Sequence, residues 1–195
     1  FLSTMAMYGR TAPLDIYGPE ELGEILRFYR EHFDEDVYEI VFHPLKMTSP
    51  EPVHESGYIR VSAFPLKHKV ECYGFRFDEV LSERQAQNHK PRSYAYCSDT
   101  MPFPELPGWV SGVDILYHEA TYQDEMADKA CSRFHSTTIQ AAQCALEAGV
   151  GKLLVGHYSS RIREFDGYIA ECRSIFPETI AAQDGDVYEF PYIRT

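Results

Sequence analysis

The sequence lacks several features that would each assign it to a particular class of protein. None of its apolar runs approaches the roughly 20 residues that a membrane-spanning helix needs, so no membrane partner is expected. The apolar opening FLSTMAMYGR has no basic region before it and no small-residue cleavage site after it, which is not the pattern of a signal peptide. The five cysteines form no C-x-x-C pair. This argues against a disulfide framework or a structural zinc knuckle, and predicts reduced thiols in a cytoplasmic protein.

Positive charge is also scarce in this chain. Its 18 Lys and Arg residues stand against 30 Asp and Glu residues, which gives a formal net charge of −12. Taken alone, this balance argues against a nucleic-acid partner, because phosphate binding usually needs a basic face. Apolar residues make up 44% of the 195 residues, as in a folded domain and unlike a disordered chain.

Hydrophobic periodicity and turn residues predict alternating strands and helices. We expect helices over residues 1–8, 20–33, 137–148 and 165–176, and strands over residues 13–19, 37–45, 58–66, 72–77, 93–97, 113–117, 153–155 and 187–190. The segment 81–91 is polar and patternless, so we expect a loop there. Thr137 and Gln140 fit a capping box, and Gly149 fits the C-terminal end of the same helix. The alternation indicates an α/β or layered α+β fold.

Side chains that can bind a metal follow several of the predicted strands directly. They are His68, Asp99, His118, Glu119 and His157. Functional sites gather in strand-end loops of layered α/β folds, and imidazole and carboxylate groups are suitable zinc ligands. Taken singly, each residue also fits a plainer interpretation, as a hydrogen-bonded residue at a strand end or, for Asp99, as a turn residue.

Longer motifs make the metal interpretation more specific. SYAYCSDT, YHEATY, FHSTTIQAAQCALEAGV and LLVGHYSSRI follow one another in this order, and GRTAPLDIYGPEEL and PLKHKVECYGF precede them. The series resembles the C-terminal part of the ribonuclease Z family of the metallo-β-lactamase superfamily. The resemblance implies a single domain over residues 1–195, with an αββα sandwich that is incomplete on its N-terminal side. It also implies a homodimeric, zinc-dependent endoribonuclease that cleaves the 3′ trailer from precursor tRNA.

The resemblance assigns roles to individual residues. His68 and His157 are expected to bind zinc, and Asp99 to bridge two zinc ions. His135 is expected not to bind metal but to protonate the leaving 3′ oxygen or stabilise its charge, while a metal-activated hydroxide attacks the phosphodiester. Glu119 is expected to orient His135 and keep it protonated.

Three further residues are expected to bind the substrate. Ser136 and Thr137 stand at the N-terminus of a predicted helix, where hydroxyl groups and free backbone N–H groups suit a phosphate. Arg161 is expected to clamp the scissile phosphate or a neighbouring one. The alternatives are a simple helix cap for Ser136 and Thr137, and a surface ion pair for Arg161.

The sequence departs from the family pattern in two places. The superfamily motif H-x-H-x-D-H is absent, and His68, Asp99 and His157 are too few ligands for a catalytic zinc pair. We therefore expect that the chain is not competent alone and that the motif precedes it in the complete protein. The flexible arm that the family has between His68 and Asp99 is also missing. Either this protein lacks the arm, or the sequence omits it near residues 78–92, which is the interpretation we favour.

Two other functions remain open at this point. The chain also fits another phosphodiesterase of the superfamily that acts on small substrates, or a truncated homologue without catalytic activity. For the metal, two zinc ions per complete site are expected, with manganese as an alternative because His and Asp ligands accept both.

Overall fold

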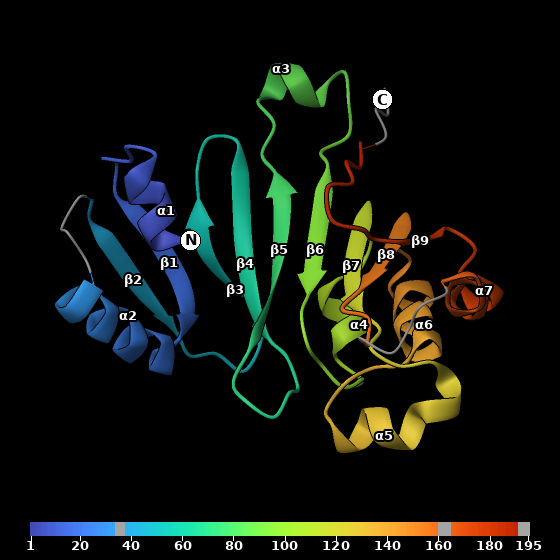
Figure 1. Ribbon diagram of the computed structural model, residues 1–195. Helices are drawn as coiled ribbons and strands as arrows, with labels where there is room; N and C mark the ends of the chain where they lie inside the picture. The colour runs from blue at the N-terminus through green and yellow to red at the C-terminus, as the bar shows by residue number, and fades with distance from the viewer. Residues whose placement is uncertain (34–37, 160–164, 191–195) are drawn as a thin grey trace. The chain divides into compact units, whose positions relative to one another are not determined.

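The first 47 residues form a unit of their own in the computed structural model, which describes residues 1–33, 38–159 and 165–190 (Figure 1). This unit holds α1 (Leu2–Met7) and the parallel strands β1 (Leu14–Pro19) and β2 (Ile40–Leu45). Parallel strands need a crossover, and α2 (Glu20–Phe33) supplies it. Gly23 lets α2 pack closely, since a Cβ there would lie 2.6 Å from the Phe42 ring.

The second unit, residues 48–195, contains a seven-stranded mixed sheet. Its strands lie in sequence order: β3 (Glu51–Glu55), β4 (Ile59–Pro65), β5 (Tyr73–Glu79), β6 (Ser93–Cys97), β7 (Ile115–Glu119), β8 (Lys152–Gly156) and β9 (Thr179–Ala181). Pairing is antiparallel from β3 to β6 and parallel from β6 to β9. Because β4 and β6 both run antiparallel to β5, the C-terminal ends of β4, β6, β7 and β8 meet at one edge of the sheet.

Helices join the parallel strands of this unit. α4 (Leu106–Trp109) lies between β6 and β7, and α7 (Asp166–Ile175) lies between β8 and β9. The connection from β7 to β8 contains the 3-10 turn η1 (Asp124–Met126), α5 (Ala127–Ser132) and α6 (Thr138–Ala148). None of the helices in the described ranges is long and apolar enough to cross a membrane.

The core of the second unit lies where α4, α6 and α7 pack against the sheet. α6 contributes a stripe of small side chains, Ala141, Ala142, Ala145 and Ala148, all buried. β7 and β8 are buried along most of their length, and Leu116, Leu153 and Val155 have no exposed surface. This packing makes a rigid base for the loops at the C-terminal strand ends.

Most predicted elements are confirmed, α6 in detail. Thr137 is its N-cap in a capping box with Gln140, and Gly149 ends it in the left-handed conformation, with φ of 63°. The strand predicted over residues 187–190 is wrong: that segment has no strand, and the edge position beside β8 belongs to β9. The predicted loop 81–91 contains a four-residue helix, α3 (Glu83–Ala86), and β3 was not predicted. The flexible arm near residues 78–92 stays a prediction.

Two capping boxes in this chain allow a matched test of helix capping. Thr137 has no exposed surface and caps α6 in the core, whereas Ser82 caps the exposed α3 with Gln85. We expect Thr137→Ala to lower the free energy of unfolding by about 1 kcal/mol, the usual effect of losing a cap. Ser82→Ala should change it less, because the core does not depend on α3. Urea unfolding measures both, and equal losses would contradict the placement of α6 in the core.

Candidate metal centre

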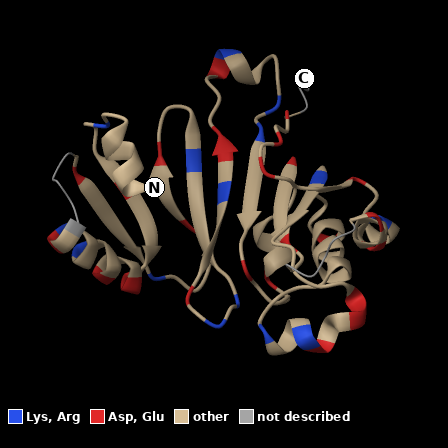
Figure 2. Cartoon of the chain, viewed as in Figure 1, with Lys and Arg blue, Asp and Glu red and all other residues tan. Residues whose placement is uncertain are grey.

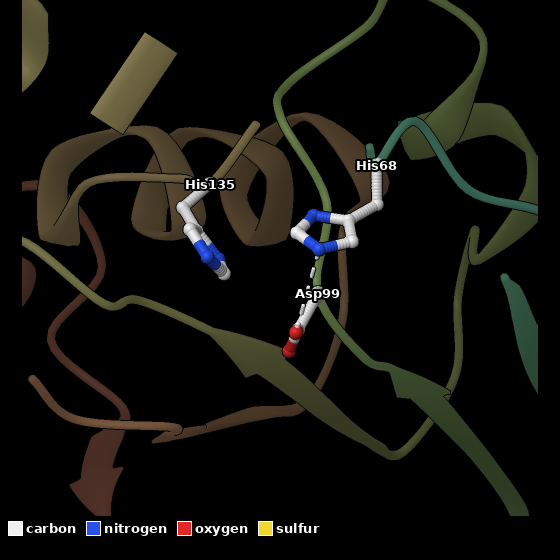
Figure 3. Close-up of side chains that lie close together, drawn as sticks. All are labelled: His68, Asp99 and His135. Atoms are coloured by element: carbon white, nitrogen blue, oxygen red, sulfur yellow. Dashed lines mark ion pairs between the residues drawn. The ribbon is translucent and has the colours of Figure 1, made fainter. Parts of the chain in front are cut away.

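His68, Asp99 and His157 come together at the edge where the strand ends meet. His68 follows β4, Asp99 follows β6 and His157 follows β8. His157 Nε2 lies 3.3 Å from Asp99 Oδ1, and His68 Nε2 lies 3.8 Å from Asp99 Oδ2. Figure 3 shows His68 and His135 on either side of Asp99, and one ligand-capable atom from each of these three residues lies within 4.8 Å of the others. His68, Asp99 and His157 thus lie at the same edge of the sheet, and their role as metal ligands stays a prediction.

Hydrogen bonds fix the orientation of both candidate ligand histidines. His68 Nδ1 donates to the carbonyl oxygen of Phe134 at 2.9 Å. Thr121 Oγ1 donates its proton to Glu119 and therefore accepts from His157 Nδ1, at 2.8 Å. In each neutral ring the lone pair is then on Nε2, the nitrogen nearest Asp99. Metal-binding histidines are usually held in this way, with the second ring nitrogen bonded to the protein.

The donor set fits a divalent metal. Two imidazole nitrogens and a carboxylate that offers both oxygens are the ligand types that zinc prefers. Three protein ligands are one fewer than a tetrahedral structural zinc site uses and too few for two ions. The residues that this structure describes therefore fit one metal with an open position, or part of a two-metal site.

The Glu119 carboxylate lies beneath this cluster and has no exposed surface. Its two oxygens accept five hydrogen bonds: from the backbone N–H groups of Thr100 (3.0 Å), Thr121 (2.9 Å) and Ser136 (3.0 Å), from Thr121 Oγ1 (2.8 Å) and from His135 Nδ1 (2.9 Å). Burial alone raises the pKa of Glu119, but the hydrogen bonds, above all that of His135, outweigh it and lower the pKa. The carboxylate is therefore ionised.

His135 sits between the candidate metal ligands and Glu119. Its ring centroid lies 4.9 Å from that of His68 and 5.3 Å from that of His157. The hydrogen bond with Glu119 raises the pKa of His135, and burial opposes this only in part. The expected contact between Glu119 and His135 is thus present, and it leaves His135 Nε2 without a protein partner in the described part of the chain.

Two residues at the site adopt positive φ without being glycine. Phe134 has φ of 60° and His157 has φ of 57°, in the left-handed region that side chains with a Cβ rarely adopt. Both conformations place a group that the site uses: the Phe134 carbonyl that orients His68, and the His157 ring itself. Strain of this kind concentrates at functional sites, where the surrounding contacts hold it in place.

His118 does not reach the metal cluster, although the sequence placed it beside Glu119. Successive side chains on a strand point to opposite faces, so only one of the two can face this edge. His118 is 1% exposed, donates from Nδ1 to the Glu119 carbonyl oxygen at 2.6 Å, and lines a different cavity of about 350 Å³ beside Phe103 and Leu106. Its expected place among the site residues is corrected accordingly.

The hydroxyl groups of the predicted substrate-binding residues are used inside the protein. Ser136 Oγ donates to the carbonyl oxygen of Thr100 at 2.7 Å, and Thr137 Oγ1 accepts from the Gln140 N–H and contacts Asp124. Both residues are fully buried, which favours the simple capping role, and substrate binding by them stays a prediction. Arg161 lies outside the described residues.

Thr121 and Thr100 are the site residues that the sequence did not single out. Thr121 links Glu119 to His157, and the Thr100 amide joins the loop of Asp99 to Glu119. In the sequence, Thr100 directly follows Asp99, and Thr121 lies two residues after Glu119. Position next to a motif residue does not by itself assign a threonine to the site.

Comparisons with known proteins identify the family and the fold. The β-lactamase superfamily domain matches residues 2–158 of the chain. A ribonuclease Z of Porphyromonas gingivalis strain W83 is 32% identical, with 94% of this chain and 74% of that protein covered. Among solved structures, the short form of human tRNase Z superposes with a TM-score of 0.73 at 24% identity, covering 92% of this chain and 68% of that one. The metallo-β-lactamase fold protein YhfI of Bacillus subtilis superposes with a TM-score of 0.68 at 18% identity, covering 90% and 65%.

The superfamily match defines the class, a metallo-β-lactamase-type domain with a mixed α/β fold, as predicted. Within that class, the chain belongs to the ribonuclease Z family. The alignment with the Porphyromonas protein runs over 224 residues, more than the 195 of this chain, so that protein has residues within the matched region that this chain lacks.

The buried carboxylate gives a direct test of how the site is held together. Glu119→Gln would place an amide N–H where only acceptors fit, leaving at least one buried donor unpaired, and should lower the free energy of unfolding by about 1–3 kcal/mol. Glu55→Gln is the matched control, because Glu55 is an exposed acid paired with Arg60 and should matter little. Thermal and urea unfolding would show the difference. A Glu119→Gln protein as stable as the control would contradict the five-bond arrangement.

Proposed function

We propose that this chain carries part of the active site of a zinc-dependent endoribonuclease that cleaves the 3′ trailer from precursor tRNA. Membership of the ribonuclease Z family supports this substrate and reaction. The observation that carries the proposal is the meeting of His68, Asp99 and His157 beside the pair formed by Glu119 and His135. This combination offers metal ligands and a proton donor within one small site.

The metal would be held by His68 Nε2, His157 Nε2 and the Asp99 carboxylate. Zinc bound there supplies Lewis acidity toward a phosphate oxygen, which favours attack on phosphorus. A two-metal site needs more ligands than these three residues offer. We propose that residues outside this sequence complete it, and that precursor tRNA binds a homodimer of the complete enzyme.

His135 is suited to the proton transfer that the leaving group requires. Its Nδ1 is held by Glu119, so the ring cannot turn, and its Nε2 remains for the substrate. The raised pKa of His135 favours the imidazolium form, which can donate a proton to the departing 3′ oxygen. Glu119 is a positioning residue in this scheme, since it contacts His135 and not the reacting atoms.

Separate loss of proton transfer and of metal binding would test these roles in the complete enzyme. His135→Ala should slow single-turnover cleavage of precursor tRNA by about 10²–10⁴-fold while the zinc content stays unchanged. His157→Ala removes a ligand, so zinc content and cleavage should fall together. Zinc is measured by mass spectrometry, and cleavage is measured at saturating enzyme so that weaker binding does not contribute.

His54→Ala is the control for these variants, because His54 lies exposed on β3, away from the strand ends that carry the site. Loss of zinc in His135→Ala would show that His135 is a ligand and that the division of roles is wrong. The alternative is a phosphodiesterase that acts on small substrates. It would be favoured if the complete enzyme cleaves a small phosphodiester such as bis(p-nitrophenyl) phosphate but does not cleave precursor tRNA.

A further inference from the structure

A cleft of about 600 Å³ opens beside the candidate metal centre. His68 and His135 form its inner wall, and the outer part contains three cations, Lys69, Lys129 and Arg133, together with the aromatic ring of Phe134. We call the outer part the basic cleft. Lys69 lies in the loop between β4 and β5, whereas Lys129 belongs to α5 and Arg133 follows it, and Figure 2 shows basic positions on both of these segments.

These cations differ from several others in this acidic protein. Arg60 pairs with Glu55, for example, and Arg92 pairs with Glu79. The three cations of the basic cleft have no ion pair with any acid in the described ranges. Lys129 is half-buried, and its ammonium lies 5.5 Å from the centroid of the Tyr122 ring. A partly desolvated cation without a counter-ion attracts an anionic ligand.

The exposed ring of Phe134 is the second observation that points to a ligand. Phe134 is 40% exposed, although its backbone is fixed by the positive φ that turns its carbonyl toward His68. The backbone N–H of Phe134 bonds to Cys131, and that of the next residue bonds to Ala130, which holds the ring at the cleft. An exposed ring among cations is the arrangement on which single-stranded nucleic acids bind, with bases stacked and phosphates paired.

We infer that the basic cleft binds the single-stranded RNA trailer beside the cleaved bond. Phe134 stacks on one base, and Lys129, Arg133 and Lys69 bind the adjacent phosphates. A base within a duplex has both faces covered, so the cleft should favour single strands over duplex RNA. The inference rests on the proposed function and deepens it, because it assigns substrate-binding residues to a site for which the sequence had named only Ser136, Thr137 and Arg161.

Binding of a fluorescein-labelled single-stranded RNA to the complete enzyme, followed by fluorescence anisotropy, tests the inference without cleavage. The RNA represents the released trailer and contains no tRNA. Phe134→Gly should weaken binding roughly tenfold, the usual effect of losing a stacked base. Glycine accepts positive φ, so this variant should fold at least as well as the wild type, and Phe134→Tyr should retain binding. Lys129→Ala should weaken binding several-fold and reduce the slope of log K against log salt by about 0.7.

Tyr58→Ala and Lys152→Ala are the matched controls. Tyr58 is an exposed aromatic residue, Lys152 is a half-buried lysine with no ion pair among the described residues, and neither lines the cleft. The inference is overturned if the trailer does not bind, if Phe134→Gly and Lys129→Ala bind it like the wild type, or if the controls lose as much. Equal binding of an acidic peptide at the same residues would also overturn it.

Cleavage of precursor tRNA is measured separately on the same preparations. If the wild-type enzyme cleaves precursor tRNA but the variants bind the trailer as tightly as it does, this inference is overturned and the proposed function stands. If the variants bind the trailer more weakly but the wild-type enzyme cleaves no precursor tRNA, the proposed function is overturned and the binding site stands.

Discussion

A single buried carboxylate holds the candidate site together. Glu119 is at the end of β7, and its five hydrogen bonds reach the loop after β6, the loop after β7 and the segment before α6. An ionised group without exposed surface is tolerated only when nearly every acceptor position is filled, so these loops cannot move independently without leaving the charge unpaired. Through Thr121 and His135, the same carboxylate determines which ring nitrogens face the space between the histidines.

The direction of the strands explains why residues far apart in sequence meet at this carboxylate. His68 arrives on a hairpin, whereas Asp99, Glu119 and His157 arrive on parallel strands joined by helices. The helices give the parallel strands a buried base, and hydrogen bonds to Glu119 anchor the loop after β6 and the loop after β7. The site is therefore positioned by the backbone of the sheet, and the hydrogen bonds of Glu119 adjust the loops upon it.

Much of this arrangement could be predicted from the sequence because its signals are local. The capping box of Thr137 with Gln140 and the terminal Gly149 marked α6 closely, and the residues after each strand marked the edge where the site lies. The failures involve information that no local pattern contains. Residues 187–190 alternate as a strand does, yet Val187 is 87% exposed, and the three-residue β9, too short to show a period, takes the place beside β8. Local sequence also does not tell which of the neighbours His118 and Glu119 has its side chain at the site. That depends on which face of β7 each side chain occupies, and the pairing register of the sheet decides this.

The change from antiparallel to parallel pairing at β6 also has a consequence for the order of folding. The hairpins from β3 to β5 close short loops and can form early, whereas β7 and β8 must wait for the long connection that contains α5 and α6. His68 and Asp99 can thus meet when β6 pairs with β5, and His157 joins them only when the crossover from β7 to β8 has closed. A metal that needs all three ligands would bind weakly to partly folded chains, and its affinity would report the last step of folding.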